Sequence, residues 1–388
     1  MTLLSSIVVR SWTEVLQASD DVQLELFRQA AARPSSGDVK PGFRAFAADL
    51  LERGLIDMGE YVTILGGTAL VCLKPGPHGR FHDMRTGHDA GELAAIYSRA
   101  KYGGVDDIRY LARCLVDYLY AELDDPCSQW TALFQDAKAC GDCVVMMTTG
   151  WRNVPSTANV LYDIVVEAVN LKLAHLALPT IINVKLPRLA PPCEHYASLS
   201  LEEREQVNLM QDHVIPSENF YRWSGVHVIF GDDVLVTGST ADKVLQESLR
   251  NGAKSFRALY PVAIDPRVAL TDATVEDRLN SVVITHQLDG TLARLLSAPG
   301  YQPILRTLRL VFGEGNREEL AAFLPKVPAP VWLDLYKAAL GNEFLAQARC
   351  LPSLVLLRSY LVRLGLLDAA GRVVLGVAVG TEGVLNCL

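Results

Sequence analysis

The segment from residue 227 to residue 240 constrains the fold more than any other part of the chain. Residues 227–230 form a short apolar, β-branched run, as expected of a buried parallel strand. Asp232 and Asp233 follow at the carboxyl end of that strand, and a turn of hydroxyl residues and glycine over 237–240 precedes a helical pattern over 241–250. The sequence therefore predicts a strand, an acid pair, a turn and a helix N-terminus in direct succession.

The predicted turn has the chemistry of a phosphate site. Several backbone N–H groups of such a turn point at one spot, and the helix N-terminus adds partial positive charge there. The carboxylates of Asp232 and Asp233 can hold ribose hydroxyls or a hydrated Mg²⁺ ion. Together these features indicate a phosphorylated pentose as the ligand. The alternative is a strand that ends in an Asx turn before a threonine-rich helix cap.

The segment Asp232-Asp233-Val234-Leu235-Val236-Thr237-Gly238-Ser239-Thr240 also resembles a family motif. It is similar to the 5-phosphoribosyl-1-pyrophosphate (PRPP) motif of the type I phosphoribosyltransferases, in which an apolar strand and two acids precede a phosphate loop ending T-G-x-T. The resemblance covers about fourteen residues, and it demands acids and loop in register between a strand and a helix. It implies that Asp232 and Asp233 contact the ribose diol and Mg²⁺. The implied 5-phosphate loop comprises Val236, Thr237, Gly238, Ser239 and Thr240.

The middle of the chain, residues 136–290, alternates between strand and helix patterns. We predict strands over 144–148, 179–184, 227–230 and 256–264, and helices over 157–173 and 240–251. This order predicts an α/β fold in which a parallel sheet is flanked by helices and binds ligands at the carboxyl ends of its strands. The connection over 186–224 is too long for a plain connector, so we expect a mobile lid there.

The flanking regions are less informative. Residues 1–135 are predicted to form a mixed hood or acceptor-binding region, with helices over 12–31 and 44–55, a strand pair over 61–73 and two helices over 91–123. Residues 291–388 are predicted to be mainly helical, with a hairpin-like tail. We interpret this last region as an accessory or dimerisation element, consistent with a homodimer.

The family layout points to further residues for the pyrophosphate of PRPP. Thr149, Gly150 and Arg152 follow the first core strand, where the family holds pyrophosphate. Lys185, at the end of the next strand, occupies a position where many members place a cation. Lys101, with Arg99 nearby, resembles an element of ComF-like phosphoribosyltransferases. The alternatives are an ordinary strand-to-helix turn with a surface arginine, a solvated lysine at a strand edge and a solvated helix end.

Cys140 and Cys143 are the one close cysteine pair among eight cysteines. A zinc site built on this pair would need a second pair at suitable spacing, and none stands out in the sequence. A redox C-x-x-C pair normally opens a helix, whereas this pair precedes an apolar strand pattern. The sequence therefore favours two structural thiols.

Composition excludes several classes of function. The net charge of −8 over 388 residues, without a basic run, argues against a nucleic-acid partner. The sequence contains no run of eighteen uncharged apolar residues, so we do not expect a membrane span. The first residues lack the pattern of a signal peptide, so we expect a cytoplasmic location.

The resemblance and the residues together predict a Mg²⁺-dependent phosphoribosyltransferase, a glycosyltransferase of nucleotide metabolism or specialised biosynthesis. It would transfer the phosphoribosyl group of PRPP to a small-molecule acceptor and release pyrophosphate. Val236 stands where 6-oxopurine salvage enzymes carry an aspartate base, so those purines are disfavoured as acceptors. The alternative is a regulatory protein that binds PRPP or a nucleotide without turnover. A different sugar-phosphate enzyme on a similar sheet is a further alternative.

Overall fold

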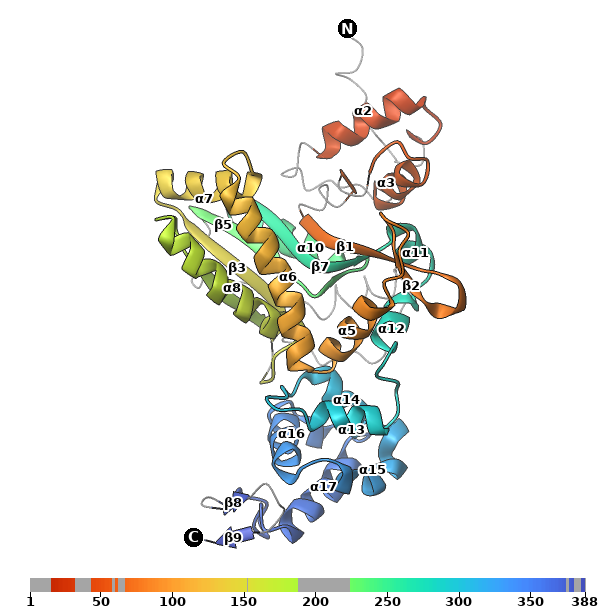
Figure 1. Ribbon diagram of the computed structural model, residues 1–388, viewed down its shortest axis with the longest axis vertical. Coiled ribbons are helices and arrows are strands. Elements are labelled where there is room, and N and C mark those ends of the chain that lie inside the picture. Colours follow the sequence, from red (N-terminus) through yellow and green to blue (C-terminus); the bar gives the residue numbers. More distant parts are fainter. Residues whose placement is uncertain are drawn as a thin grey trace. The chain divides into compact units, whose positions relative to one another are not determined.

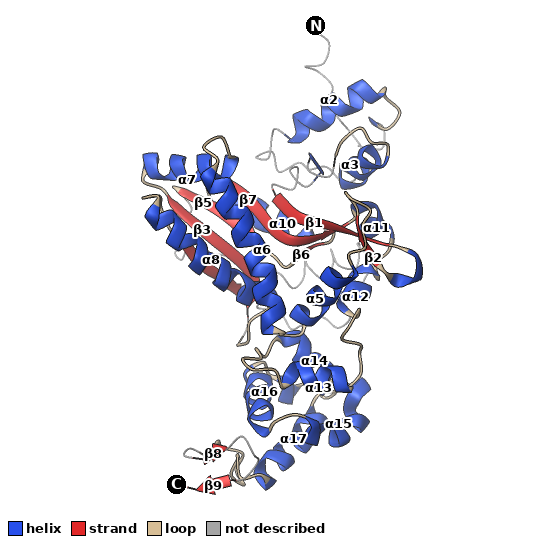
Figure 2. Ribbon diagram, viewed as in Figure 1, coloured by secondary structure: helices blue, strands red, loops and turns tan. Residues whose placement is uncertain are grey.

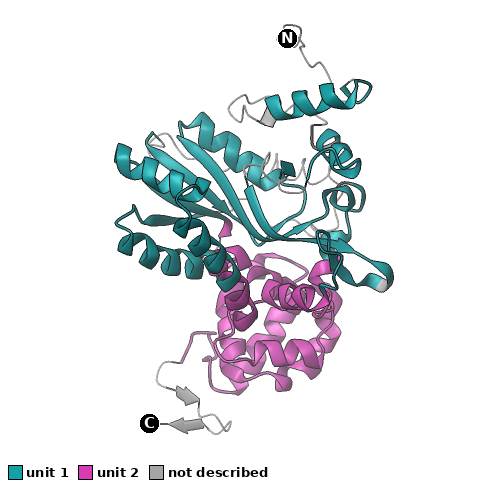
Figure 3. Cartoon of the chain, turned by 45° about the horizontal axis from the view of Figure 1, so that its top comes forward, with its two compact units in different colours: residues 1–90, 113–148, 162–277 teal, residues 91–112, 149–161, 278–388 magenta. Residues whose placement is uncertain are grey.

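The computed structural model describes residues 15–31, 43–57, 60–61, 67–151, 153–187, 224–374, 377–379 and 385–387. The chain divides into two compact units (Figure 3). Unit 1 comprises residues 1–90, 113–148 and 162–277, and unit 2 comprises residues 91–112, 149–161 and 278–388. Each unit is assembled from segments that are distant in sequence, whereas the regions predicted above are consecutive.

Figures 1 and 2 show the arrangement of the helices and strands. The strands are β1 (Gly67–Pro75), β2 (Phe81–Asp83), β3 (Cys143–Trp151), β4 (Ile181–Pro187), β5 (Val226–Gly231), β6 (Val234–Leu235), β7 (Ser255–Ile264), β8 (Val377–Val379) and β9 (Leu385–Cys387). The α-helices are α2 (Asp20–Ala31), α3 (Phe43–Glu52), α5 (Gly91–Lys101), α6 (Val105–Asp124), α7 (Gln129–Cys140), α8 (Thr157–His175), α10 (Ser239–Arg250), α11 (Pro266–Thr271), α12 (Val275–Asn280), α13 (Gly290–Leu296), α14 (Leu305–Phe312), α15 (Arg317–Phe323), α16 (Ala329–Gly341) and α17 (Leu351–Arg363). Short 3₁₀ turns are η1 (Pro77–Gly79), η3 (Glu314–Asn316), η4 (Leu324–Lys326) and η5 (Phe344–Ala346).

A seven-stranded sheet organises unit 1, with the order β2-β1-β7-β5-β3-β4 and β6 paired to β7. Among the pairings described for this sheet, β1–β7, β7–β5, β5–β3 and β6–β7 are parallel, and the edge strand β2 runs antiparallel to β1. The predicted α/β fold with a mostly parallel sheet flanked by helices is therefore confirmed. The pairing of β1 with β7 joins residues about 190 positions apart in the chain. No local pattern in the sequence predicts this pairing.

Side chains alternate between the two faces of this sheet, as the pleat requires. Even-numbered residues such as Val228, Phe230 and Tyr260 share one buried cluster with Val244 of α10. On the other face, Arg257 of β7 stacks on Trp130 of α7, and Gly231 of β5 lies against Tyr162 of α8. Figure 1 shows α10 on the far side of β7 from α7. The sheet is thus a middle layer between helices.

Unit 2 is a helical body with its own core. Trp332 of α16 is fully buried, its ring lies edge-on to Phe323 at 5.9 Å between centroids, and its indole N–H donates to the Leu324 carbonyl over 2.9 Å. Ser98 of α5 ties the segment 91–112 to the later helices, because its hydroxyl donates to the Asn280 carbonyl over 2.6 Å. The predicted C-terminal helices and the hairpin β8–β9 are both present.

In the N-terminal region one prediction is confirmed and one is wrong. Helices α5 and α6 agree with the two helices predicted over 91–123. The strand pair predicted over 61–73 is wrong for its described part, because residues 67–73 belong to the single strand β1, whose hairpin partner is β2. Gly67 begins β1 and pairs with Ala258 of β7.

Candidate functional site

The acid pair lies where the predicted strand ends. Residues 226–231 form β5, and the backbone N–H of Asp232 still donates to the Leu259 carbonyl of β7 over 3.3 Å. The side chain of Asp232 then accepts from the backbone N–H of Asp233 over 3.0 Å, which closes a tight local turn. Asp233 is 5% exposed and Asp232 is half-buried. Both carboxylates thus leave the sheet at its carboxyl end.

The register of the strands explains why the hydrogen-bond ladder with β7 is interrupted at the acid pair. Gly231 pairs with Leu259 and Val234 pairs with Val262, so β5 and β6 keep the same offset along β7. Asp233 therefore stands level with Pro261, which has no N–H to donate to a ladder. The missing donor is a physical reason for the interruption of pairing between β5 and β6, and the acids occupy that interruption.

A buried tyrosine supports the acid pair from α8. The hydroxyl of Tyr162 donates to the Asp232 carbonyl over 3.2 Å and also contacts the Leu259 carbonyl. A Cβ at Gly231 would lie 2.6 Å from two carbons of the Tyr162 ring, so the ring lies directly against the backbone there. Burial raises the pKa of the Tyr162 phenol well above its ordinary value, so this hydroxyl remains protonated and able to donate.

The phosphate-loop prediction corresponds to a tight turn before α10. Gly238 is the N-cap of that twelve-residue helix and has φ +75°, a left-handed conformation that favours glycine. The hydroxyls of Thr237 and Ser239 lie 2.9 Å apart and share a hydrogen bond. Ser239 is 8% exposed, whereas Val236 and Thr240 are half-buried. The turn at the helix N-terminus and the acid pair before it therefore occur together in unit 1, in the predicted order.

Lys185 is held by an acid of the neighbouring helix. Its ammonium group lies 2.7 Å from Oδ2 of Asp163 on α8, and Asn183 donates to the other carboxylate oxygen over 2.6 Å. The lysine side chain is 30% exposed. A cation therefore stands at the predicted position on β4, and an ion pair already engages it.

The turn after β3 is closed by side chains of its own unit. The carbonyl of Thr149 accepts from the Ser156 hydroxyl over 3.1 Å and from the Asn159 amide over 3.3 Å. Gly150 has φ +82°, which explains the glycine at this position. This arrangement is that of a well-capped strand-to-helix turn. Arg152, the cation predicted beside it, lies outside the described residues.

The lysine predicted from the ComF-like element ends α5 in unit 2. Lys101 lies over the Tyr97 ring at 5.5 Å from its centroid. Arg99 forms an ion pair with Asp107 of α6, with a guanidinium nitrogen 2.7 Å from the carboxylate. The lid predicted over 186–224 falls mostly on residues 188–223, which lie outside the described residues.

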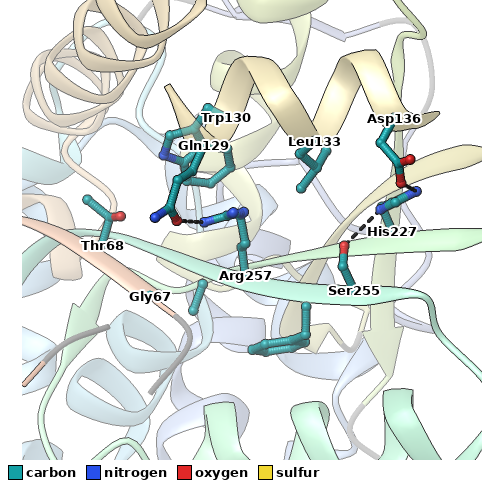
Figure 4. Close-up of a pocket in the computed structure, with 11 residues that line it drawn as sticks. Gly67, Thr68, Gln129, Trp130, Leu133, Asp136, His227, Ser255 and Arg257 are labelled. Atoms are coloured by element: carbon teal, nitrogen blue, oxygen red, sulfur yellow. Dashed lines mark hydrogen bonds and ion pairs between the residues drawn. The ribbon is translucent and has the colours of Figure 1, made fainter. Parts of the chain in front are cut away.

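A second polar group was missed by the sequence prediction, and it lies at the opposite end of the same strands. Asp136 and Cys140 on α7, Asp142 in the next turn, His227 at the start of β5 and Lys254 before β7 form a cluster. Asp136 and His227 also line a pocket of about 290 Å³ between α7 and the sheet (Figure 4). The one available signal in the sequence was the C-x-x-C pair Cys140 and Cys143 with Asp142 between them, and this signal alone does not identify His227 or Asp136 as neighbours.

The comparisons add no family to these observations. Neither protein-family models nor curated proteins nor solved structures give a match to this chain. Among the residues that the structure describes, no helix has the length and apolar character needed to cross a membrane.

Proposed function

We propose that the protein binds PRPP through residues 232–240 and transfers its phosphoribosyl group to a small acceptor. The observation that carries the proposal is the direct succession of an acid pair in an interrupted strand ladder and a left-handed glycine turn at the N-terminus of α10. A phosphate and a vicinal diol are the ligand groups that such a turn and such acids suit.

Each half of the segment has a separate task in this proposal. The turn from Thr237 to Thr240 would hold the 5-phosphate through backbone N–H groups and hydroxyls. The carboxylates of Asp232 and Asp233 would accept hydrogen bonds from the ribose hydroxyls. In the reaction the C1–oxygen bond of PRPP breaks, pyrophosphate leaves with the electron pair, and the acceptor nucleophile bonds to C1 and loses a proton. Positioning and electrostatics would supply the catalysis.

The residues present fit a magnesium ion. Asp232 and Asp233 offer only carboxylate oxygens, the hard donors that Mg²⁺ prefers, and the ion usually binds through one or two carboxylates together with substrate phosphates. When bound, Mg²⁺ would neutralise charge that develops on the departing pyrophosphate. Val236, which precedes the turn, has no group that accepts a proton, so we do not expect a 6-oxopurine acceptor.

A regulatory protein that binds PRPP without turnover is the second candidate. Lys185 is paired with Asp163, and Arg99 with Asp107. Cations that are already engaged by acids are less available to the negative charge of pyrophosphate. This observation favours a sensor, because a sensor needs the 5-phosphate turn and the diol-binding acids but not the groups that assist departure of pyrophosphate.

Two measurements on one set of variants test the proposal. Calorimetric titration with PRPP and Mg²⁺ measures binding, and release of pyrophosphate with candidate acceptors measures turnover. We expect the double variant Asp232→Asn, Asp233→Asn to lose at least tenfold in PRPP affinity, because contacts to the diol and the ion are removed together. The matched control is Asp124→Asn, Asp125→Asn, a consecutive acid pair at the end of α6 that removes the same formal charge.

The outcomes separate the two candidates. Binding that depends on the acid pair, together with pyrophosphate release, supports the transferase. Binding with the same dependence but no release with any acceptor supports the sensor. If PRPP does not bind, or if the acid-pair variant binds it as the control does, both candidates are wrong.

A further inference from the structure

The cluster at the amino end of the strands gathers donors of several chemical types from three parts of unit 1. Asp136 and Cys140 lie in the last two turns of α7, and Asp142 lies in the turn that leads into β3. Single donor atoms of these residues all lie within 4.8 Å of one another. His227, the second residue of β5, brings an imidazole to the same place, with Nε2 3.4 Å from Asp142 Oδ2 and 3.6 Å from Asp136 Oδ2.

Local structure holds these donors in position. Helix α7 ends at Gly141, which has φ 70°, so the chain reverses and carries Asp142 back toward the helix. The turn then packs closely against the residue before β5, because a Cβ at Gly225 would lie 2.9 Å from Asp142 Oδ1. Cys143 continues the tie, since its N–H donates to the Gly225 carbonyl over 2.9 Å. Local contacts therefore hold the backbone around the cluster in place.

The imidazole of His227 is the observation that points to a ligand. Its side chain is 3% exposed, and its Nδ1 lies 2.8 Å from the Ser255 hydroxyl, which fixes the ring orientation (Figure 4). Its Nε2 is buried and has no hydrogen-bond partner among the described residues. The contact of 3.4 Å to Asp142 is longer than an ordinary N–H···O hydrogen bond. A buried ring nitrogen thus faces two carboxylates without a hydrogen bond to either.

We propose that His227, Asp136, Asp142 and Cys140 form a binding site for a divalent transition metal of the zinc class. A tetrahedral ion with metal–ligand distances of about 2.0–2.3 Å holds neighbouring donor atoms about 3.3–3.7 Å apart. The separations of 3.4 and 3.6 Å from Nε2 to the two carboxylates already match that spacing. The bond between Nδ1 and Ser255 corresponds to the outer hydrogen bond that orients metal-binding histidines.

The donor set decides the class of metal. Imidazole and thiolate ligands select zinc and its transition-metal neighbours, whereas Mg²⁺ prefers oxygen ligands alone. The site is therefore distinct from the Mg²⁺ site proposed at Asp232 and Asp233, and the inference does not depend on that proposal. The pocket that Asp136 and His227 line gives an ion a route to the cluster.

Lys254 is the competitor for this site. Its ammonium group lies 2.7 Å from Asp142 Oδ2 and 3.3 Å from Asp136 Oδ2, so it neutralises the same carboxylates that a metal would use. Its side chain is 38% exposed, which allows it to swing into solvent when an ion binds. The rival interpretation is that Lys254 is the permanent counter-ion of the cluster. Removal of the lysine distinguishes the two, because it should strengthen metal binding.

The test is titration of the chelator-treated, reduced full chain with Zn²⁺ by calorimetry, with Co²⁺ as a spectroscopic probe. We expect saturable binding of one ion, a higher unfolding temperature in the presence of Zn²⁺, and an absorption band of thiolate-bound Co²⁺ in the near ultraviolet. Mg²⁺ should not compete at equal concentration. The variant Asp232→Asn, Asp233→Asn should bind Zn²⁺ as the parent does.

Variants at exposed Cys140 and half-buried Asp142 identify the ligands without disturbing the hydrophobic core. Cys140→Ser and Asp142→Asn should each weaken Zn²⁺ binding by roughly tenfold or more, and Cys140→Ser should remove the Co²⁺ charge-transfer band. Cys143→Ser and Cys127→Ser are matched thiol controls at exposed positions and should leave affinity unchanged. Lys254→Met should increase affinity.

Three outcomes would overturn the proposal. The first is no saturable Zn²⁺ binding in either the parent or Lys254→Met, which would leave Lys254 as the permanent counter-ion. The second is equal loss of affinity in Cys143→Ser and Cys140→Ser, which would indicate a two-thiol site. The third is undiminished binding in Asp142→Asn together with Cys140→Ser, which would place the ion elsewhere on the chain.

Discussion

The two ends of β5 carry two different candidate sites. The site at the carboxyl end consists of one continuous stretch of chain, residues 232–240. At the amino end, His227 lies beside residues from α7, from the turn before β3 and from the residue that precedes β7. The first end depends on backbone shape, because Gly231 packs on a tyrosine ring and Gly238 is left-handed. The second depends on charge, because two carboxylates share a lysine beside a buried imidazole. An added Cβ atom should disturb the first end, and a change of pH should disturb the second, so the comparison can be tested.

Gly231→Ala is expected to have the largest effect on stability. The new Cβ would meet the ring of Tyr162 at 2.6 Å, and that ring cannot withdraw easily because it is fully buried and its hydroxyl is bonded to two carbonyls. Overpacking of this kind costs about 1–3 kcal/mol in unfolding free energy. Equilibrium unfolding in urea measures it, and the cost should be the same at every pH between 5 and 8.

The matched control is Gly315→Ala, at a glycine whose new Cβ would meet nothing within 4 Å and whose φ is not positive. It should cost little. A further check is the background Tyr162→Leu, in which the alanine should cost less because the two sites are in contact. Equal costs for Gly231→Ala and Gly315→Ala would contradict the close packing at the carboxyl end.

Gly238→Ala is expected to have an intermediate effect. An alanine held at φ +75° costs about 1–2 kcal/mol, because its Cβ approaches the next carbonyl oxygen. Gly252→Ala is the matched control, since Gly252 follows the other end of α10 with φ +89° and open space around its Cβ position. Both variants should lose similar stability in urea unfolding.

Only the variant at Gly238 should change the affinity for a phosphate-bearing ligand, because only that turn belongs to the candidate phosphate site. Titration of both variants with PRPP and Mg²⁺ separates strain from ligand contact. Equal losses of affinity in Gly238→Ala and Gly252→Ala would mean that the turn matters for the fold and not for a ligand, and the contrast between the two ends of the sheet would then lose its functional meaning.

The same contrast explains what the sequence could predict. The strand, acid pair, turn and helix over 227–251 are set by local periodicity and by glycine and hydroxyl residues in fixed order, so they could be located from the sequence. The cluster at the amino end could not. Asp136, His227 and Lys254 are far apart in the chain, and they meet only because β3, β5 and β7 pair in a particular order. His227 was recognised only as the first residue of a strand.

Helix α7 illustrates a missed local signal. Ser128 caps its first turn by accepting from the Trp130 N–H over 3.0 Å, and Gly141 ends it. Both residues are ordinary helix-boundary signals, but no helix was predicted over 129–140. Without that helix, Asp136 and Cys140 could not be placed on one face, and the cysteine pair was interpreted as two structural thiols. The pairing of β1 with β7 was missed for a different reason, since long-range parallel pairing has no local sequence pattern.

Asp142→Asn in the metal-free protein is expected to have the smallest effect, and it is the one that should depend on pH. The hydrogen bond from Lys254 holds the pKa of the Asp142 carboxyl below its ordinary value of 3.8. A carboxyl with a lowered pKa in the folded state stabilises the fold above its unfolded-state pKa, and this contribution is lost as the pH falls through the folded-state pKa. The asparagine variant lacks the contribution at every pH.

The difference in unfolding free energy between parent and Asp142→Asn should therefore be constant from pH 7 to about pH 5 and should shrink below the ordinary carboxyl range. It should be small throughout, because Lys254 is 38% exposed and water and salt screen the pair. Urea unfolding at a series of pH values, in low and high salt, measures it. Asp124→Asn removes a more exposed partner of Lys172 and serves as the control, with a still smaller difference. If the difference in unfolding free energy for Asp142→Asn does not change with pH, the Asp142 side chain stabilises the fold through packing and not through its charge. The two ends of β5 would then not differ in the way proposed.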